Sequence, residues 1–284
     1  MIKRESDPPA HWDALLREAL AQAPDLVRDD AEWLLLHVLG LSRAGLYARL
    51  RDPVEAQAAA RFQALWQRRC AGEAHAYLTG EREFYGRPFQ VTPAVLIPRA
   101  DSECLLEAAL GCWPIGRAGT VVDAGTGSGA LAISFALERP QATVHASDYS
   151  AAALQVAQAN ARALGAPVQF WRGDWLQALQ ADSVDLILSN PPYIDEHDPH
   201  LAELARGGEP RSALVAGEDG LADLRTLIDQ ARRVLRAGGW LWLEHGWDQA
   251  PAVRAALQAA GFAAVRSERD LGGHERASGG RTPG

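Results

Sequence analysis

A glycine-rich loop near the middle of the chain has the composition of a cofactor-binding turn. Residues 123–130, DAGTGSGA, follow an apolar run and precede a stretch with helical patterning. Glycines at such a point let the backbone turn sharply and approach a ligand closely. Gly125, Gly127 and Ala130 also satisfy the dinucleotide pattern G-x-G-x-x-A, so the loop alone does not separate a nicotinamide cofactor from S-adenosylmethionine. Its place between a strand and a helix predicts an adenosine-type cofactor.

Two later positions could bind the rest of such a cofactor. Asp148 ends the next expected strand, about 20 residues beyond the loop, where an acidic side chain accepts hydrogen bonds from a ribose diol. We favour this role over the alternative, a helix N-cap. Asp174 and Trp175 end the strand after it, and a polar group beside an aromatic ring suits the edge and the face of adenine. A core position for Trp175 is an equal alternative.

The sequence Asn190-Pro191-Pro192-Tyr193 follows another expected strand and has the composition of an acceptor site. The two prolines fix the backbone and remove two N–H donors, which leaves the Asn190 side-chain oxygen and the Pro191 carbonyl as acceptors. Two acceptors suit a planar NH2 group, and Tyr193 can lie against its face. Asn190, Pro191 and Tyr193 are therefore the candidate catalytic residues, and the run from Asn190 through Pro192 to Tyr193 is the candidate substrate site.

This loop favours methyl transfer to nitrogen over hydride transfer. An amide or ring amino nitrogen is a poor nucleophile because its lone pair is delocalised. Two acceptors on its hydrogens raise the electron density at nitrogen and aim the nitrogen at a sulfonium methyl. Holding the reacting atoms about 3–3.5 Å apart and in line supplies much of the rate. No strong base is needed beforehand, since the proton becomes acidic once the nitrogen is alkylated. A dehydrogenase has no use for such a loop.

Other polar groups do not indicate chemistry. His197 and His200 lie in an acidic stretch, residues 195–198, which we interpret as a solvated loop rather than a metal site. His245, beside Glu244, is interpreted as a hydrogen-bonding residue at a strand end. No serine or cysteine has the surroundings of a nucleophile elbow. We therefore expect no metal and no covalent nucleophile.

The elements that would position these residues differ along the chain. Residues 1–72 have helical patterning, with apolar stripes in 11–21 and 29–38. Asp52-Pro53 predicts the start of a third helix that runs to Cys70. These residues predict a small helical bundle that binds a partner or covers a site. Residues 75–98, aromatic and β-branched but broken by glycine and proline, are typical of a hairpin linker.

Strands and helices alternate from Thr120 onward, which predicts a parallel, doubly wound α/β sheet. In such sheets ligands bind at the carboxyl ends of the strands, where each motif above falls. The glycine-rich end, residues 272–284, lacks a buried pattern and is expected to be loose. The expected strands are 121–125, 142–148, 167–174, a strand within 184–193 that also includes the loop after it, 240–244 and 263–268. The expected helices are 130–138, 151–164, 221–235, which Gly238-Gly239 would stop, and 250–260.

Composition excludes several classes of protein. A length of 284 residues allows roughly two domains, and 48% hydrophobic with 23% charged residues excludes a disordered chain. No apolar run reaches the roughly 18 residues of a membrane span, and the N-terminus has no signal-peptide pattern. A net charge of −8 argues against direct binding to nucleic-acid phosphates. Cys70, Cys104 and Cys112 lack disulfide-framework or zinc-site spacing. We expect a cytoplasmic monomer without membrane contact.

Together these motifs resemble the bacterial glutamine-N5 methyltransferases that modify peptide-chain release factors, the PrmC/HemK family. The resemblance covers nearly the whole chain. Asn-Pro-Pro-Tyr alone is shared with adenine and guanine amino methyltransferases, so the longer runs carry the resemblance. They are AYLTGEREFYG (76–86), LIPRADSE (96–103), DAGTGSG (123–129), GDW (173–175), SNPPYIDEHDPHL (189–201), EPRSALVAGEDGL (209–221) and LWLEHG (241–246).

The resemblance implies a Rossmann-like class I methyltransferase sheet (99–284), preceded by a helical substrate-recognition module (1–73) and a β-hairpin linker (74–98). It implies S-adenosyl-L-methionine as cofactor, S-adenosyl-L-homocysteine as product, and methylation of the glutamine N5 in the Gly-Gly-Gln loop of class I release factors. Residues Asn190 to Tyr193 would hold the glutamine amide. The implied cofactor residues are Gly125, Thr126, Gly127, Ser128, Gly129, Asp148, Asp174, Trp175 and Asn190.

Arg99 would lie near the cleft by the same resemblance, and a salt bridge to Asp101 or Glu103 is an equal alternative. The sequence also departs from the family pattern. Ala100 stands where a second proline is usual, and Gly208 stands where an aromatic residue usually precedes Glu-Pro. The glycine-rich tail puts the length of the last strand in question, but not the activity.

Two other functions stay open. A nucleic-acid amino methyltransferase would share the cofactor loop and Asn-Pro-Pro-Tyr, but it needs a basic cleft and salt-sensitive binding, and the net charge of −8 counts against it. A protein that binds S-adenosylmethionine without transferring the methyl group would act as a partner-binding module. The intact Asn-Pro-Pro-Tyr sequence counts against that function.

Overall fold

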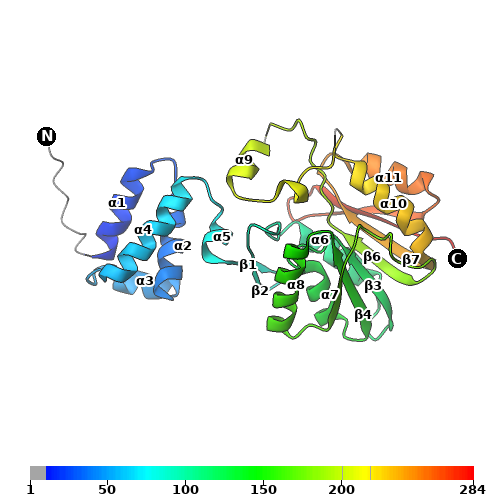
Figure 1. The fold of residues 1–284 in the computed structure, drawn as a ribbon, viewed down its shortest axis with the longest axis horizontal. Helices are drawn as coiled ribbons and strands as arrows, with labels where there is room; N and C mark the ends of the chain where they lie inside the picture. The colour runs from blue at the N-terminus through cyan, green and yellow to red at the C-terminus, as the bar shows by residue number, and fades with distance from the viewer. Residues whose placement is uncertain (1–10, 200, 218) are drawn as a thin grey trace. The chain divides into compact units, whose positions relative to one another are not determined.

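A computed structural model describes residues 11–199, 201–217 and 219–284 of the chain. The contacts divide it into two compact units. The first, which we call the helical unit, extends to Gly80 and includes residues 206–208; the second, the sheet unit, comprises the remainder from Glu81. The helices and strands of both units are labelled in Figure 1.

The helical unit contains α1 (Trp12–Gln22), α2 (Arg28–Leu39), α3 (Arg43–Arg49), α4 (Ala56–Cys70) and α5 (His75–Thr79). The expected helical bundle is confirmed. Its apolar stripes meet in one core, and side chains such as Leu16, Leu34 and Phe62 are fully buried there. Gly40 ends α2 in the left-handed conformation, as its position predicts.

Three details of the helical unit differ from expectation. The third predicted helix begins at Ala56 rather than at Asp52, because Pro53 instead forms a bridge with His11. The short helix α3 was not predicted. The segment 75–79, expected in the hairpin linker, is the helix α5, and its Leu78 is buried in the helical core.

The sheet unit opens with the expected hairpin, β1 (Glu81–Phe84) and β2 (Arg87–Gln90), which pair antiparallel. Seven further strands then form one sheet in the order β5-β4-β3-β6-β7-β9-β8. Strands β3 to β7 pair in parallel, while β9 runs antiparallel to both its neighbours. Their bounds are β3 Gly119–Ala124, β4 Ala142–Asp148, β5 Val168–Arg172, β6 Val184–Ser189, β7 Leu235–Glu244, β8 Ala263–Arg269 and β9 Glu275–Arg281. The doubly wound α/β fold is confirmed.

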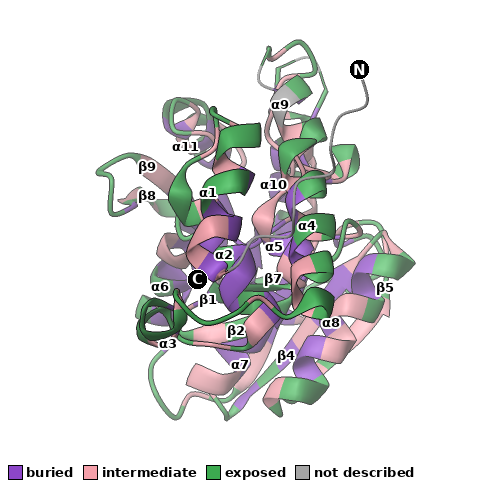
Figure 2. Ribbon diagram, turned by 90° about the vertical axis from the view of Figure 1, so that its left-hand side faces the viewer, coloured by how far each residue is buried: buried purple, intermediate pink, exposed green. Residues whose placement is uncertain are grey.

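Helices cover both faces of this sheet (Figure 1). Successive strand residues point to opposite faces, so Val121 packs in one core and Val122 in the other. Buried residues follow the strands and the helix surfaces turned toward them (Figure 2). One face carries α6 (Ser102–Gly111), which the sequence did not predict, α7 (Ala130–Glu138) and α8 (Ala151–Leu164), and the other carries α10 (Ala222–Val234) and α11 (Ala250–Ala259); the short α9 (Leu201–Arg206) and a 3-10 turn (Arg211–Ala213) follow β6.

The glycine-rich end of the chain is not loose, and that prediction is wrong. Residues 275–281 form β9, hydrogen-bonded between β7 and β8, and Ala277 and Ser278 are fully buried. The glycines allow close packing: a Cβ atom on Gly279 would lie 2.4 Å from Cδ2 of Trp242. Similarly, Gly238-Gly239 lie inside β7 rather than stopping a helix, since α10 ends at Val234.

Two further observations concern the described part of the chain. None of its helices has the length and apolarity that crossing a membrane requires. Its three cysteines are free thiols, of which Cys70 is exposed and Cys104 and Cys112 are half-buried.

Candidate active site

The glycine loop joins β3 to α7 in a conformation that requires glycine. Gly125, Gly127 and Gly129 have φ values of 75°, 54° and 85°, all in the left-handed region. A Cβ atom on Gly125 would lie 2.9 Å from Cζ3 of Trp175, so the Trp175 ring packs directly over the loop. Trp175 itself has φ 47°, an uncommon backbone conformation for a side chain of this size.

Asp148, at the end of β4, organises the turn beside this loop. Its Oδ2 accepts from the backbone N–H of Gly127 at 2.9 Å, and its Oδ1 accepts from the N–H of Ser150 at 2.8 Å. Ser150, rather than Asp148, is the N-cap of α8. Its Oγ accepts a hydrogen bond from Ala153 N at 3.2 Å. Burial raises the pKa of Asp148, and the two backbone N–H donors lower it.

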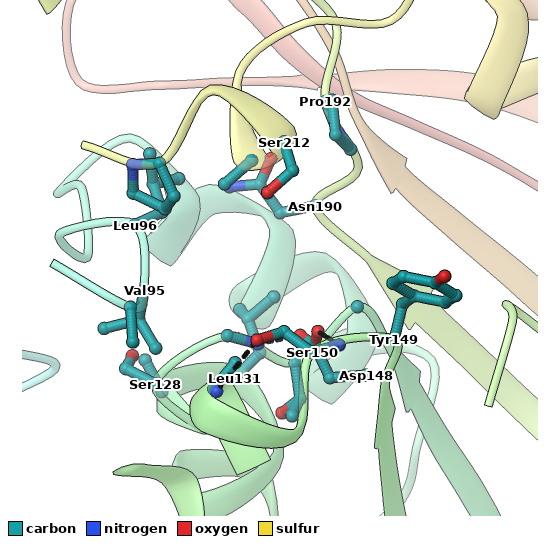
Figure 3. Close-up of a pocket in the computed structure, with 18 of the residues that line it drawn as sticks. Val95, Leu96, Ser128, Leu131, Asp148, Tyr149, Ser150, Asn190, Pro192 and Ser212 are labelled. Atoms are coloured by element: carbon teal, nitrogen blue, oxygen red, sulfur yellow. Dashed lines mark hydrogen bonds between the residues drawn. The ribbon is translucent and has the colours of Figure 1, made fainter. Parts of the chain in front are cut away.

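A cavity of about 320 Å³ lies at the carboxyl edge of the parallel strands. In Figure 3, Asn190, Pro192 and Ser212 lie on one side of it, and Ser128 and Asp148 lie on the other. Of the predicted site residues, the described lining includes Gly125, Thr126, Gly127, Ser128, Asp148, Asp174, Trp175, Asn190 and Pro192, but not Gly129 or Pro191. Trp175, half-buried, both packs over the loop and lines the cavity, so its two expected roles are compatible.

A second cavity, of about 160 Å³, adjoins the first. The two share Leu96, Arg99, Asn190 and Ala213 in their linings, and Tyr193 lines the second. Asn190 therefore stands at the junction of a larger chamber and a smaller one. An atom held at this junction is exposed to both chambers, as a transfer between two ligands requires.

Hydrogen bonds from several elements hold the Asn-Pro-Pro-Tyr loop. Ile194 N donates to the carbonyl oxygen of Leu214 at 2.9 Å, and Gln249 Nε2 donates to the carbonyl oxygen of Tyr193 at 3.0 Å. The side chains are held as well: Asn190 Nδ2 donates to Ser102 Oγ at 3.1 Å. Tyr193 OH donates to Glu244 Oε1 at 3.3 Å. Burial, with the charge of Glu244, raises the pKa of Tyr193, so its hydroxyl stays protonated.

Arg99 lines both cavities, as expected, but its ion-pair partner is neither Asp101 nor Glu103. Its Nη2 lies 2.6 Å from Oε2 of Glu209, whose side chain is 4% exposed. Glu209 Oε1 also accepts from Ile97 N at 3.2 Å. Glu209 thus links the loop between β2 and α6, residues 91–101, to the segment that follows α9. Residues from both segments line the cavities.

The polar groups that the sequence analysis set aside have local roles. His245 bonds through its two ring nitrogens to Gly246 O at 2.8 Å and to Ser278 Oγ at 2.7 Å, which confirms a hydrogen-bonding residue at a strand end. His197 is exposed, and its backbone N–H donates to Asp195 Oδ1 at 2.7 Å. His200 lies outside the described residues, among which no cluster of metal-ligating side chains occurs.

Sequence reasoning missed four polar residues around the site: Ser102, Glu209, Asp223 and Glu244. Ser102 and Asp223 line the larger cavity. The signal that could have found Glu244 is its position, because it ends a buried strand at the same edge of the sheet as Asp148 and Asn190. Ser102 and Glu209 lie outside the alternating strand–helix pattern, and their sequence signal is that they fall within two of the runs that carry the family resemblance, 96–103 and 209–221.

The cavity fits an adenosine-type cofactor. Its volume lies within the range of small-molecule sites, roughly 300–1,000 Å³. At Gly127 the loop backbone is open, since a Cβ atom there would meet nothing within 4 Å, and Thr126, Asp148 and Asp174 are among the polar residues that line the chamber. These residues would hold the group.

Fold and site together define a class I methyltransferase. A Pyrococcus furiosus methyltransferase has a similar fold, with a TM-score of 0.53, 17% identity, and coverage of 76% of this chain and 97% of that one. A Thermus thermophilus 16S rRNA methyltransferase, solved with AdoMet and guanosine, has a TM-score of 0.53 and 20% identity, with coverage of 71% and 49%. Residues 102–206 match the family model of the methyltransferase small domain.

Sequence similarity identifies the family. Residues 13–80 match the model of the PrmC N-terminal domain. The release factor glutamine methyltransferase of Bordetella pertussis is 54% identical, covering 94% of this chain and 98% of its own length. Those of Burkholderia pseudomallei and Escherichia coli are 51% and 44% identical, covering 93% and 95% of this chain, and 95% and 98% of their own. The chain belongs to the family of release factor glutamine methyltransferases.

Proposed function

We propose that this protein transfers the methyl group of S-adenosyl-L-methionine to the side-chain amide N5 of the glutamine in the Gly-Gly-Gln loop of class I release factors. The observation that carries the proposal is the position of Asn190 in the walls of both cavities. The larger cavity would take the cofactor and the smaller one the glutamine amide. The family membership supports the same reaction.

The cofactor would be held by Gly125 to Ser128, Asp148, Asp174 and Trp175. When bound, it supplies an electrophilic methyl group on a sulfonium. Asp148 would accept hydrogen bonds from a ribose diol, since each carboxylate oxygen has a second lone pair beyond the one that a backbone N–H occupies.

The Asn-Pro-Pro-Tyr loop would orient the acceptor amide. Asn190 donates its Nδ2–H to Ser102, which turns its Oδ1 toward another donor. That oxygen and the Pro191 carbonyl would accept the two amide hydrogens, and Tyr193 would lie against the amide plane. These contacts place the nitrogen at the junction of the cavities. Proximity and alignment of this kind supply much of the rate in group transfer.

Labelled S-adenosylmethionine tests the proposal directly. The acceptors are an intact release factor, the same factor with its loop glutamine replaced by alanine, and duplex DNA. We expect label on the intact factor alone. Label on DNA alone would instead support a nucleic-acid amino methyltransferase. Cofactor binding with no label on any acceptor would support a binding module without transfer.

A further inference from the structure

A buried carboxyl group lies behind the Asn-Pro-Pro-Tyr loop without lining either cavity. Glu244 ends β7 and is 1% exposed. Its Oε1 accepts the hydrogen bond from Tyr193 OH at 3.3 Å. Its Oε2 has no hydrogen-bond partner among the described residues. An unpaired buried oxygen destabilises the folded protein, so a role for this carboxyl beyond packing is expected.

Ser102 connects this carboxyl group to Asn190. It is the first residue of α6 and is 4% exposed. Its Oγ accepts from Asn190 Nδ2 at 3.1 Å, and its side chain also interacts with Glu244, whose pKa it lowers. A lowering of that kind indicates that the serine hydroxyl favours the ionised carboxylate.

The chemistry of the three groups gives this chain of contacts one direction. A carboxylate can only accept hydrogen bonds, so in its interaction with Glu244 the Ser102 hydroxyl turns its hydrogen toward the carboxylate. The lone pairs of Ser102 Oγ are then left to accept, and of the two ends of the Asn190 amide only Nδ2–H can donate. Asn190 Oδ1 is consequently the end that stays free for an acceptor N–H. A neutral group in place of the carboxylate would allow the opposite orientation.

We propose that Ser102 and Glu244 are positioning residues that fix the orientation of the Asn190 amide, while the same carboxylate holds Tyr193 through its hydroxyl. The inference rests on the proposed function, because it assumes that Asn190 Oδ1 binds the substrate amide. Neither residue forms or breaks a bond in the transfer. Their effect is on the fraction of enzyme whose loop is correctly oriented.

The proposal implies that turnover depends on pH, because only the ionised Glu244 carboxylate fixes the orientation of the Ser102 hydroxyl and, through it, of the Asn190 amide. Burial raises the pKa of Glu244 to about 7, against the opposing effects of Ser102, Arg276 and Tyr193. The charged and titratable groups that face Glu244 are Arg276 on β9, Tyr193 in the Asn-Pro-Pro-Tyr loop, Asp101 just before α6, and Cys104 in α6. Turnover should therefore rise as the pH increases through about 7.

The test compares turnover, KM for the release factor and cofactor affinity from pH 6 to 8.5. We expect Glu244→Gln and Ser102→Ala to lower kcat by roughly 10- to 100-fold, the loss typical of misplaced reacting groups, with cofactor affinity close to that of the wild type. Both should also lose the rise through neutral pH. Ser102→Thr, which keeps the hydroxyl, should retain turnover and the rise.

Ser134→Ala is the matched control, since Ser134 is a buried serine of α7 with no hydrogen-bond partner among the described residues, and it lines neither cavity. Its turnover should equal that of the wild type. Equal kcat in Ser102→Ala, or a Glu244→Gln profile with the wild-type rise, would overturn the inference while leaving the proposed function intact. An inactive wild type would instead contradict the proposed function itself.

Discussion

At the scale of single residues, Asn190 is the side chain on which both proposed ligands converge. It lines both cavities, and its Nδ2 is already bonded to Ser102 at 3.1 Å. Its truncation would remove an acceptor and leave the backbone of the loop in place, since Leu214 and Gln249 hold that backbone independently.

We therefore predict that Asn190→Ala abolishes most transfer while the cofactor still binds. Loss of one pre-aligned hydrogen-bonding group in a catalytic site typically lowers kcat by roughly 10²- to 10³-fold. Single-turnover methylation and equilibrium cofactor binding would be measured on the same preparation. Turnover at the wild-type level would show that the loop does not bind the acceptor as proposed.

A second residue-scale prediction concerns Asp123, which is fully buried at the end of β3. Burial raises its pKa to about 7, while hydrogen bonds from Thr126 and Ala132 lower it. The folded protein thus holds this proton more tightly than the unfolded chain does. The stability that the protonated group contributes is present below the unfolded-state pKa and is lost as pH rises through about 7.

Asp123→Asn should accordingly reduce the fall in the free energy of unfolding between pH 5 and 8. One such group changes that free energy by at most about 1.4 kcal/mol per pH unit. Urea unfolding at each pH measures the slope, with Asp229→Asn, at an exposed position of α10, as the control. Equal slopes in the wild type and Asp123→Asn would contradict the assignment.

At the scale of elements, β9 is the part of the sheet that depends most on its glycines. A Cβ atom on Gly279 would lie 2.4 Å from Trp242 Cδ2 and 2.6 Å from the carbonyl oxygen of Leu241. The clash involves backbone and a fully buried ring, neither of which can move easily. The strand therefore packs only with glycine at this position.

We predict that Gly279→Ala lowers the free energy of unfolding by about 1–3 kcal/mol, the usual cost of overpacking a core. Gly111→Ala, at the exposed C-terminal end of α6 with no atom near the added methyl, should leave stability unchanged or raise it by up to about 1 kcal/mol. Chemical denaturation of both variants measures the difference. An unaffected Gly279→Ala would mean that β9 can separate from β7.

The same strand shows where prediction from the sequence reaches its limit. Val121 and Val122 lie in an apolar run between two loops, so β3 and the glycine loop after it were predictable from local pattern. The reason for Gly279 is its contact with Trp242, 37 positions earlier in the chain, and no local pattern carries that information. The contacts of Ser102 and Glu209 could not be predicted for the same reason, because their partners, Asn190 and Arg99, are distant in the sequence.

At the scale of the whole molecule, all the described residues that line the two cavities belong to the sheet unit. The helical unit has its own core, and it carries exposed apolar side chains, among them Trp33 at 53% and Tyr47 at 49% exposed. Chemistry and recognition are thus separable in principle: the sheet unit would bind the cofactor and the glutamine, and the helical unit would contact the release factor away from its loop.

Removal of the helical unit tests this division. The cut is placed after Gly80, because a shorter deletion would leave the apolar Leu78 of α5 without its core. We expect residues 81–284 to bind the cofactor nearly as tightly as the full chain, and KM for the release factor to rise by at least tenfold, about 1.4 kcal/mol of lost binding. Trp33→Ala with Tyr47→Ala in the full chain should raise the same KM without altering cofactor affinity. Equal loss of factor and cofactor binding in the truncated chain, with no effect of the paired substitution, would mean that the helical unit stabilises the fold and does not recognise the substrate.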